Sequence, residues 1–487
     1  MIKILTIKEF KNILLSPKFS VTFLMTSILI LLSLFIGIQE YNIKQVQFET
    51  GNKMAAQQLS ERTHWGGANT QIFREPNPMQ IFVSGVSNDI GRFSNISEYD
   101  PVKLRKSMYS DDPVFAVFRS IDLVFIIQVV LSLLAILFTY DSINGEREDG
   151  TLKLVLANAI PRWKYLFAKF SGAWLGLIVP LSIPLLIGLL LLMVYNIPIQ
   201  PMAARLSLLI VMGLLYYTFF IGIGLLISAL TRNSSSSFLF LLVFWVVAVL
   251  IVPRIGTMAA GQIVPTISQS EIESQIEQFA NQQWQKHEDY LKDVWKERNL
   301  ETDGLSAEER QAYKDEKMWQ WMEEDDNARN AMQKEISEYS RRAKEKMVNQ
   351  KSEQENLGFN LARISPAATF MLSAMNLAGT DVHLKNRYEK DLDTYKESFT
   401  DFTNKKAKES GDSGGIRITM DSESGMSIKM ADMKKTLDTS DMPRFVNLPR
   451  RMATVLSQTI IDFGILSTMI LLTLGASFLA FVRYDVR

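Results

Sequence analysis

Histidines come first among the side chains that could do chemistry, because they serve as metal ligands and as general bases near neutral pH. The chain of 487 residues has three, His64, His287 and His383. Glu288 follows His287, but the second histidine that completes a zinc-binding helix is absent. Serines are plentiful, and no catalytic triad can be assembled from the sequence. The sequence therefore predicts a chain without catalytic residues of its own.

A group of methionines near the C-terminus offers soft thioether sulfur, the kind of ligand that Cu(I) prefers. Its members are Met420, Met426, Met430, Met433 and Met442. The alternative is that these methionines pack in a small domain. We prefer that alternative and predict neither a metal nor another cofactor bound by this chain.

A phosphate-binding loop needs the pattern Gly-x-x-x-x-Gly-Lys-Ser/Thr, whose amides and lysine hold the phosphates. The chain contains no Gly-Lys dipeptide. Any nucleotide that powers this protein is therefore expected on another polypeptide.

Six uncharged apolar runs are long enough to cross the hydrocarbon layer of a membrane as helices. They predict spans at 19–38, 123–140, 170–195, 206–230, 235–253 and 462–483. Pro180 and Pro184 predict a kinked or broken third span. The interiors of the spans lack charge, which argues against a proton- or ion-driven carrier. The charged residues expected at span edges, as interfacial anchors, are Asp122, Lys169, Arg254 and Asp462.

Lysine and arginine in short loops indicate the orientation, because these residues resist translocation. They cluster before the first span, between the second and third, and after the sixth. This distribution places both termini in the cytoplasm. A cleavable signal peptide is the weaker interpretation of the N-terminus, because the first run is longer than a signal core and has no small-residue cleavage site.

The segments outside the spans differ in pattern. Ile4, Ile7, Phe10 and Leu14 predict an interfacial helix within 1–18. The extracytoplasmic segment 39–122 shows no sustained periodicity. In the large extracytoplasmic domain 254–461, charged stretches with apolar residues at helical spacing predict long helices, with Gly304 at a turn between them. A small β-hairpin is expected at 416–430.

The stretch 141–169 between the second and third spans is the most informative one. It reads Asn144-Gly-Glu-Arg-Glu-Asp-Gly-Thr-Leu, then a short apolar turn that ends before Pro161-Arg162. The layout predicts a helix, a break at Gly150 and a second short helix. Taken as a pattern alone, it is an amphipathic loop on the membrane surface.

The same residues resemble the coupling segment of the ATP-binding-cassette (ABC) type-two permease family. The resemblance rests on Glu146-x-Glu148-x-Gly150-Thr151-Leu152, on Pro161-Arg162, on Lys169 and on the order of the spans. It implies that this segment docks on a separate ATPase subunit. Glu146 and Glu148 would pair with basic residues of that subunit or cap a helix, and Gly150 would allow an unusual backbone angle.

A second resemblance concerns Ser365-Pro366, Gly379-Thr380-Asp381, Tyr388 and Tyr395. These residues are similar to the insert of an uncharacterised bacterial branch of the family, in which a large outside domain lies between spans five and six. That branch usually has more histidine after the Gly-Thr-Asp. His383 alone follows here, which weakens a metal interpretation of the position.

Taken together, the fold class expected is a membrane all-α protein with six transmembrane helices, an interfacial helix and a mainly helical outside domain with a small β element. The resemblance implies an exporting permease of the bacterial inner membrane, paired with an ABC ATPase that carries ATP and Mg²⁺. A second permease copy or a related permease, membrane lipid and a periplasmic protein are the further partners expected, and nothing points to nucleic acid. The alternative function is a mechanotransmission or scaffold complex that moves periplasmic partners without passing a substrate.

Overall fold

A computed structural model describes residues 2–98, 102–106, 121–157, 160–410, 417–421, 425–429, 437–447 and 450–483. Within them, six helices are long and apolar enough to cross a membrane, and the structure is mainly helical, as predicted. The candidate spans are Pro17–Ser60, Leu123–Glu148, Arg162–Val194, Gln200–Leu230, Ser234–Ile263 and Met452–Val482. The chain folds into two compact units, Met1–Ile251 with Ser365–Arg487, and Val252–Ile364.

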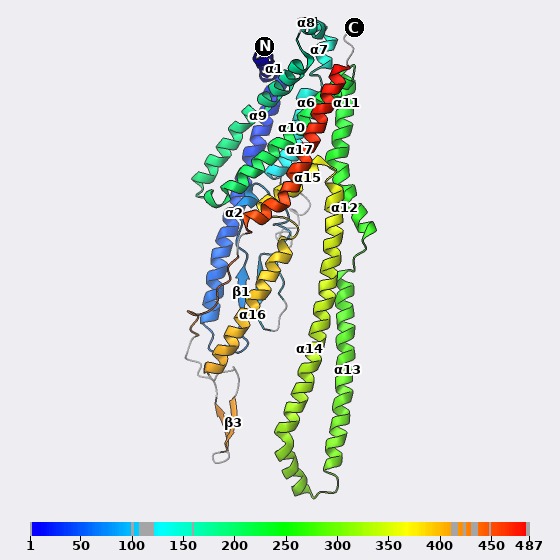
Figure 1. Ribbon diagram of the computed structural model, residues 1–487. Coiled ribbons are helices and arrows are strands. Elements are labelled where there is room, and N and C mark those ends of the chain that lie inside the picture. Colours follow the sequence, from blue (N-terminus) through cyan, green and yellow to red (C-terminus); the bar gives the residue numbers. More distant parts are fainter. Residues whose placement is uncertain are drawn as a thin grey trace. The chain divides into compact units, whose positions relative to one another are not determined.

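The first unit begins with helix α1 (Ile2–Leu14), which turns at Ser16 into α2 (Pro17–Ser60). The Ser16 hydroxyl accepts from the amide of Phe19, and Pro17 occupies the first helical position, so the start of α2 is well defined. Helix α2 continues far beyond the end predicted for the first span. Helix α9 (Arg162–Val194) packs along both α1 and α2 (Figure 1).

Two of the membrane helices contain a π-helical turn. One spanning helix joins α5 (Leu123–Phe125), the π-turn η2 (Ile126–Leu131) and α6 (Ser132–Thr139). Another joins α11 (Ser234–Trp245) to the π-turn η4 (Val246–Ile251). The indole of Trp245 donates to the Ser132 hydroxyl at 2.8 Å, so the two turns lie close together and are joined by a buried hydrogen bond.

The core of this unit is built around α10 (Ala203–Leu230), preceded by the 3₁₀ turn η3 (Gln200–Met202). Helix α15 (Pro366–Ala378) and helix α17 (Met452–Val482) pack against it. Phe370 of α15 stacks on Tyr216 with ring centroids 4.8 Å apart. Helix α15 is thus a buried core helix of this unit.

A second, smaller core lies beyond the end of the spans that is opposite α1. It joins α2 to the antiparallel pair β1 (Thr70–Phe73) and β2 (Phe93–Ile96), in which Thr70 pairs with Ile96, and to α16 (Leu384–Ser410). The 3₁₀ turn η1 (Pro78–Ile81) packs on α2. Burial raises the pKa of Tyr395 to about 12, so its hydroxyl stays protonated and donates to the carbonyl of Pro443 at 3.1 Å.

A hairpin lies where the sequence predicts one. Strands β3 (Arg417–Asp421) and β4 (Gly425–Lys429) are antiparallel, with Arg417 opposite Lys429. Several residues of the expected hairpin and of the methionine group lie outside the described residues, as do the side chains of the strands.

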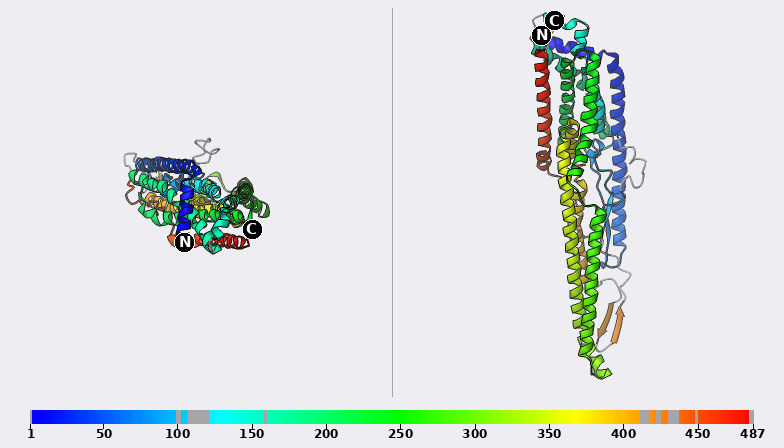
Figure 2. Two further views of the ribbon diagram at one scale, coloured as in Figure 1. Left: turned by 90° about the horizontal axis from the view of Figure 1, so that it is seen from above. Right: turned by 90° about the vertical axis from the view of Figure 1, so that its right-hand side faces the viewer.

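The second unit is a helical hairpin. Helix α12 (Val252–Ile263) and helix α13 (Gln269–Glu301) both pack against the 56-residue helix α14 (Ala307–Ala362), as Figures 1 and 2 show. Ser306 and Glu309 form a reciprocal capping box at the start of α14. Gly304 has a φ of +92° in the connecting turn, a left-handed conformation that side chains with a Cβ resist.

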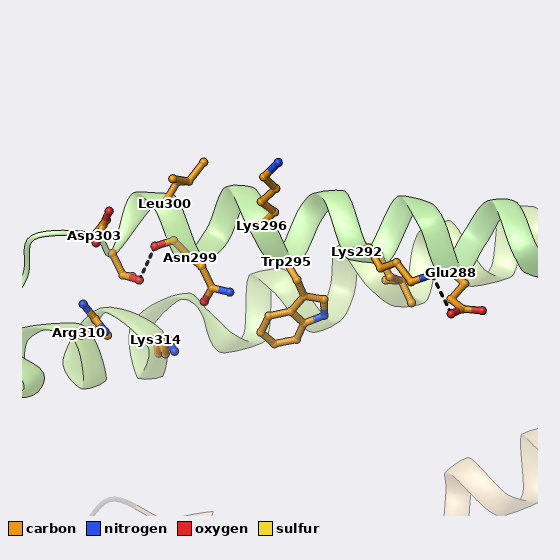
Figure 3. Close-up of a pocket in the computed structure, with 11 residues that line it drawn as sticks. Glu288, Lys292, Trp295, Lys296, Asn299, Leu300, Asp303, Arg310 and Lys314 are labelled. Carbon is orange, nitrogen blue, oxygen red and sulfur yellow. Dashed lines mark hydrogen bonds and ion pairs between the residues drawn. The ribbon is translucent and has the colours of Figure 1, made fainter.

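Arg298 joins the two long helices near that turn. It is 5% exposed, and its guanidinium donates twice to the Asp325 carboxylate, each time at 3.1 Å. The group also lies over the rings of Trp295 and Trp321. A neighbouring hollow of about 790 Å³ is lined by residues such as Lys292, Trp295 and Arg310 (Figure 3).

Several expectations differ from the structure. The range 254–461, predicted as one domain, is divided, because α15 and α16 belong to the unit that contains the spans. Helix α9 continues through Pro180 and Pro184, so the third span is not broken there. Asp462, expected as an interfacial anchor at an edge, is fully buried in α17, and Lys169 is 5% exposed. Both are held among neighbouring helices, which the linear pattern of apolar runs cannot show.

Replacing Arg298 with alanine should loosen the hairpin. The change removes the guanidinium that donates to Asp325 and that lies over two indole rings. We therefore expect amide hydrogen exchange in residues 290–301 to speed up by roughly tenfold or more. Arg341→Ala is the matched control, because Arg341 is exposed and pairs with Glu345 one turn away on the same helix. Equal exchange in both variants would contradict a structural role for Arg298.

Candidate functional site

Segment 141–169 contains two short helices and the first turns of α9. Helix α7 (Asn144–Glu148) is followed by Gly150, whose φ is +71°, and then by α8 (Thr151–Ala157). The Thr151 hydroxyl donates to the carbonyl of Glu146 at 3.2 Å across the break. A Cβ at Gly150 would meet no atom within 4 Å, so the glycine serves the backbone angle here and not close packing.

A buried charge cluster lies beneath α7. Lys169 of α9 forms ion pairs with Glu9 of α1 at 2.7 Å and with Glu146 of α7 at 2.8 Å. The Tyr165 hydroxyl donates to the other oxygen of Glu146 at 2.7 Å, and Lys8 lies 3.7 Å from that carboxylate. We call Lys169, Glu9, Glu146 and Tyr165 the Lys169 cluster. It ties three separate helices together through groups that would be costly to leave unpaired.

Helix α1 approaches α9 very closely beside this cluster. A Cβ on Gly172 would collide with the Cβ of Glu9, so no other residue fits at this position without moving α1. The hydroxyls of Thr6 and Ser171 are 3.2 Å apart. The N-terminal helix is thus held against α9 by packing as well as by charge.

Glu148 and Asn144 attach α7 to the other side of the bundle. The Glu148 carboxylate accepts from the amide of Ser234 at 2.7 Å and from its hydroxyl at 2.8 Å, so it caps the N-terminus of α11. The dipole of α11 favours a negative charge at this end. Asn144 is fully buried and donates to Thr231 at 3.0 Å, and it accepts from Ser228.

Leu152 and Arg162 connect the segment to the last helix. Leu152 is 1% exposed and belongs to a small apolar cluster with Tyr165 and Phe481. Arg162, directly after Pro161, donates to the carbonyl of Phe481 at 2.9 Å and also to that of Val482. A cation at the C-terminal end of α17 compensates its unpaired carbonyls and the helix dipole.

The opposite face of α8 is exposed. Leu154 is 69% exposed, and Lys153 and Ala157 are exposed beside it. The segment therefore combines a firmly attached inner face with an outer face that carries one apolar and one basic side chain. An arrangement of this kind can receive a partner protein and pass its movement to several helices at once.

The structure thus brings the predicted residues 146, 148, 150–152, 161 and 162 into one compact region. Their contacts differ from those expected. Glu146 has its partners inside this chain, and Glu148 caps a helix that follows 86 residues later. Glu9, Tyr165 and Asn144 were missed by the sequence analysis. An acidic residue in a helix otherwise surrounded by lysines was the only local signal for Glu9.

The described residues contain no group of three or more His, Asp or Glu side chains placed to hold a metal ion. The side chains of Met420, Met426, Met430 and Met433 lie outside the described residues. Met442 packs at the edge of the small core around Tyr395.

Replacing Lys169 with methionine should destabilise the protein by roughly 3 kcal/mol, because two carboxylates then lie close together without their cation. The triple variant Lys169→Met, Glu9→Gln, Glu146→Gln should recover much of this loss. The thermal midpoint in detergent, followed by tryptophan fluorescence, measures both effects. The exposed Lys11→Met serves as control. If Lys169→Met alone is as stable as the wild type, the Lys169 cluster does not hold the three helices together.

Comparison with known proteins identifies the family. The model of the ABC-2 family transporter proteins matches residues 4–292, more than half of the chain, and a domain of unknown function, DUF3526, matches residues 269–414. A search of curated proteins finds no significant match. With its six apolar helices, the chain is a multi-pass membrane protein and a permease subunit of an ABC transporter. It belongs to the ABC-2 transporter family.

Proposed function

We propose that segment 141–169 is the surface through which a separate ATPase subunit drives this permease. The observation that carries the proposal is the three-sided attachment of α7 and α8. They are tied to α1 and α9 by the Lys169 cluster, to α10 and α11 by Asn144 and Glu148, and to α17 by Leu152, while Arg162 at the start of α9 caps the end of α17. A force applied to α8 therefore reaches five helices.

The outer face of α8 supplies the contact. Leu154 would enter an apolar groove of the ATPase, and Lys153 would pair with acidic residues at its edge. The glycine break lets α8 lie across the bundle instead of continuing α7. ATP and Mg²⁺ belong to the partner subunit, and closure of two ATPase subunits on ATP would move two permease copies, or this chain and a related permease.

The orientation that accompanies this proposal places α7, α8 and both ends of the chain in the cytoplasm of a bacterial inner membrane. Basic residues near this end of the helices support it, because such residues are retained on the cytoplasmic side. We infer an exporter, whose outside parts guide an amphipathic cargo or a periplasmic partner.

A second candidate function is favoured by the hairpin of α13 and α14. At about 1.5 Å per residue, a helix of 56 residues is roughly 80 Å long, and such a rod can carry movement away from the membrane. The complex would then act on periplasmic proteins without passing a substrate. ATP-dependent accumulation of an amphiphile in inverted vesicles supports the exporter, whereas ATP hydrolysis without any uptake supports the second function.

Leu154→Asp should abolish the association with the ATPase. A carboxylate in an apolar groove costs several kcal/mol, so we expect recovery of the partner to fall by at least tenfold. The measurement is purification of the tagged chain from native membranes, with mass-spectrometric quantification of the ATP-binding-cassette protein that accompanies it.

The matched control is Leu300→Asp, the same substitution at another exposed leucine, near the turn of the α13–α14 hairpin. It should leave recovery unchanged. Wild-type recovery with Leu154→Asp would show that α8 is not the docking surface, provided that both variants reach the membrane in equal amounts.

A further inference from the structure

A cavity of about 990 Å³ lies at the distal end of the spans, opposite α7 and α8. It is bounded by α2 around Lys44, by the segment 73–80, by η3 and by the start of α16. Its volume is at the upper end of the range that small-molecule sites occupy. All of its walls belong to the unit that contains the spans, so the cavity is part of one packed body.

Cationic side chains predominate in this cavity. Among them are Lys44, Arg74, Arg92, Arg205, Arg387 and Arg450. Glu75 and Asp391 are the acidic side chains in the described lining, and within the described residues neither forms an ion pair with Arg74 or Arg205. The lining therefore carries an excess of positive charge.

Part of that charge is neutralised within the protein. Asp381, the last residue of the Gly-Thr-Asp motif, holds Arg387 through two hydrogen bonds of 2.6 and 3.2 Å and holds Arg450 at 2.9 Å. Lys44 pairs with Glu40 at 2.6 Å. These three cations have structural partners and need no ligand.

Arg74 and Arg205 are different. Arg74 donates to the carbonyl of Ser87 at 2.6 Å and to its hydroxyl at 3.4 Å, and Arg205 donates to the carbonyl of Arg450 at 2.7 Å. In the described part of the chain neither has a carboxylate partner. Half-buried guanidinium groups held only by neutral acceptors keep donors and charge available, and their planar fork matches phosphate or carboxylate.

Apolar side chains form another part of the lining. Phe48, Phe73, Met54, Met202 and Leu384 all face the cavity. A solvated basic surface would not need such a wall, and a site for a small inorganic anion would not need so large a volume. The combination fits a ligand with an anionic head and a hydrocarbon part.

We propose that this cavity binds the anionic head of an amphiphile, with its phosphate or carboxylate held by Arg74 and Arg205 and its hydrocarbon part against Phe48, Phe73 and Met202. The chemistry is that of an acidic lipid. The proposal does not depend on ATPase docking, because the cavity lies at the opposite end of the spans from Leu154.

The test is equilibrium binding of radiolabelled didecanoyl phosphatidylglycerol to the full-length chain in a non-ionic detergent. The double variant Arg74→Gln, Arg205→Gln should weaken binding roughly tenfold to a hundredfold, as expected for the loss of hydrogen bonds to a charged group. Arg341→Gln with Arg342→Gln, the same change on the exposed face of α14, is the control and should bind like the wild type.

Competition on the wild-type chain separates the sources of the anion. Didecanoyl phosphatidylcholine, glycerol phosphate and inorganic phosphate should each compete at least tenfold more weakly than phosphatidylglycerol. Equal competition by phosphatidylcholine, or by inorganic phosphate, overturns the proposal, as does unchanged binding by the double variant. If the double variant fails to fold, as judged by size exclusion and its thermal midpoint, the competition series decides alone.

Discussion

A single buried lysine sets the geometry of the end of the bundle that carries α7 and α8. Lys169 cannot be charged inside the protein without carboxylates beside it, and the two that it has come from α1 and α7. The charge requirement of one side chain therefore fixes where the N-terminal helix lies and how the two short helices are mounted. Gly172 adds a steric condition, since only a residue without a Cβ lets α1 come close enough for Glu9 to reach the lysine.

Helix caps also stabilise this end of the bundle. Glu148 supplies negative charge where α11 begins, and Arg162 supplies positive charge where α17 ends, so both follow the electrostatics of helix termini. Because the caps come from one short segment, that segment cannot shift without exposing backbone groups of two spans. The caps act together with the apolar cluster that contains Leu152, Tyr165 and Phe481.

Much of this could be predicted from the sequence. Length and absence of charge identified the six candidate spans, and the motif around Gly150 identified the family and the left-handed break. Pairings between distant positions could not be predicted, because Glu146 and Glu9, or Asp381 and Arg450, share no local pattern. The burial of Asp462 and the union of α15 and α16 with the spans depend on tertiary packing. Arg298 looked like one more charge in a charged helix until its partners on α14 were known.

The contacts of α17 have a consequence for biosynthesis. This helix follows α9 and α10 in the chain, yet its end at Phe481 and Val482 receives the Arg162 cap, and Arg450 just before it accepts a hydrogen bond from Arg205 and donates one to Asp381. During translation the nascent chain therefore holds Arg162 and Arg205 without these acceptors until α17 has been inserted. A chain truncated before residue 450 would lack the acceptors of Arg162 and Arg205, so the loss of α17 would be felt at both ends of the bundle.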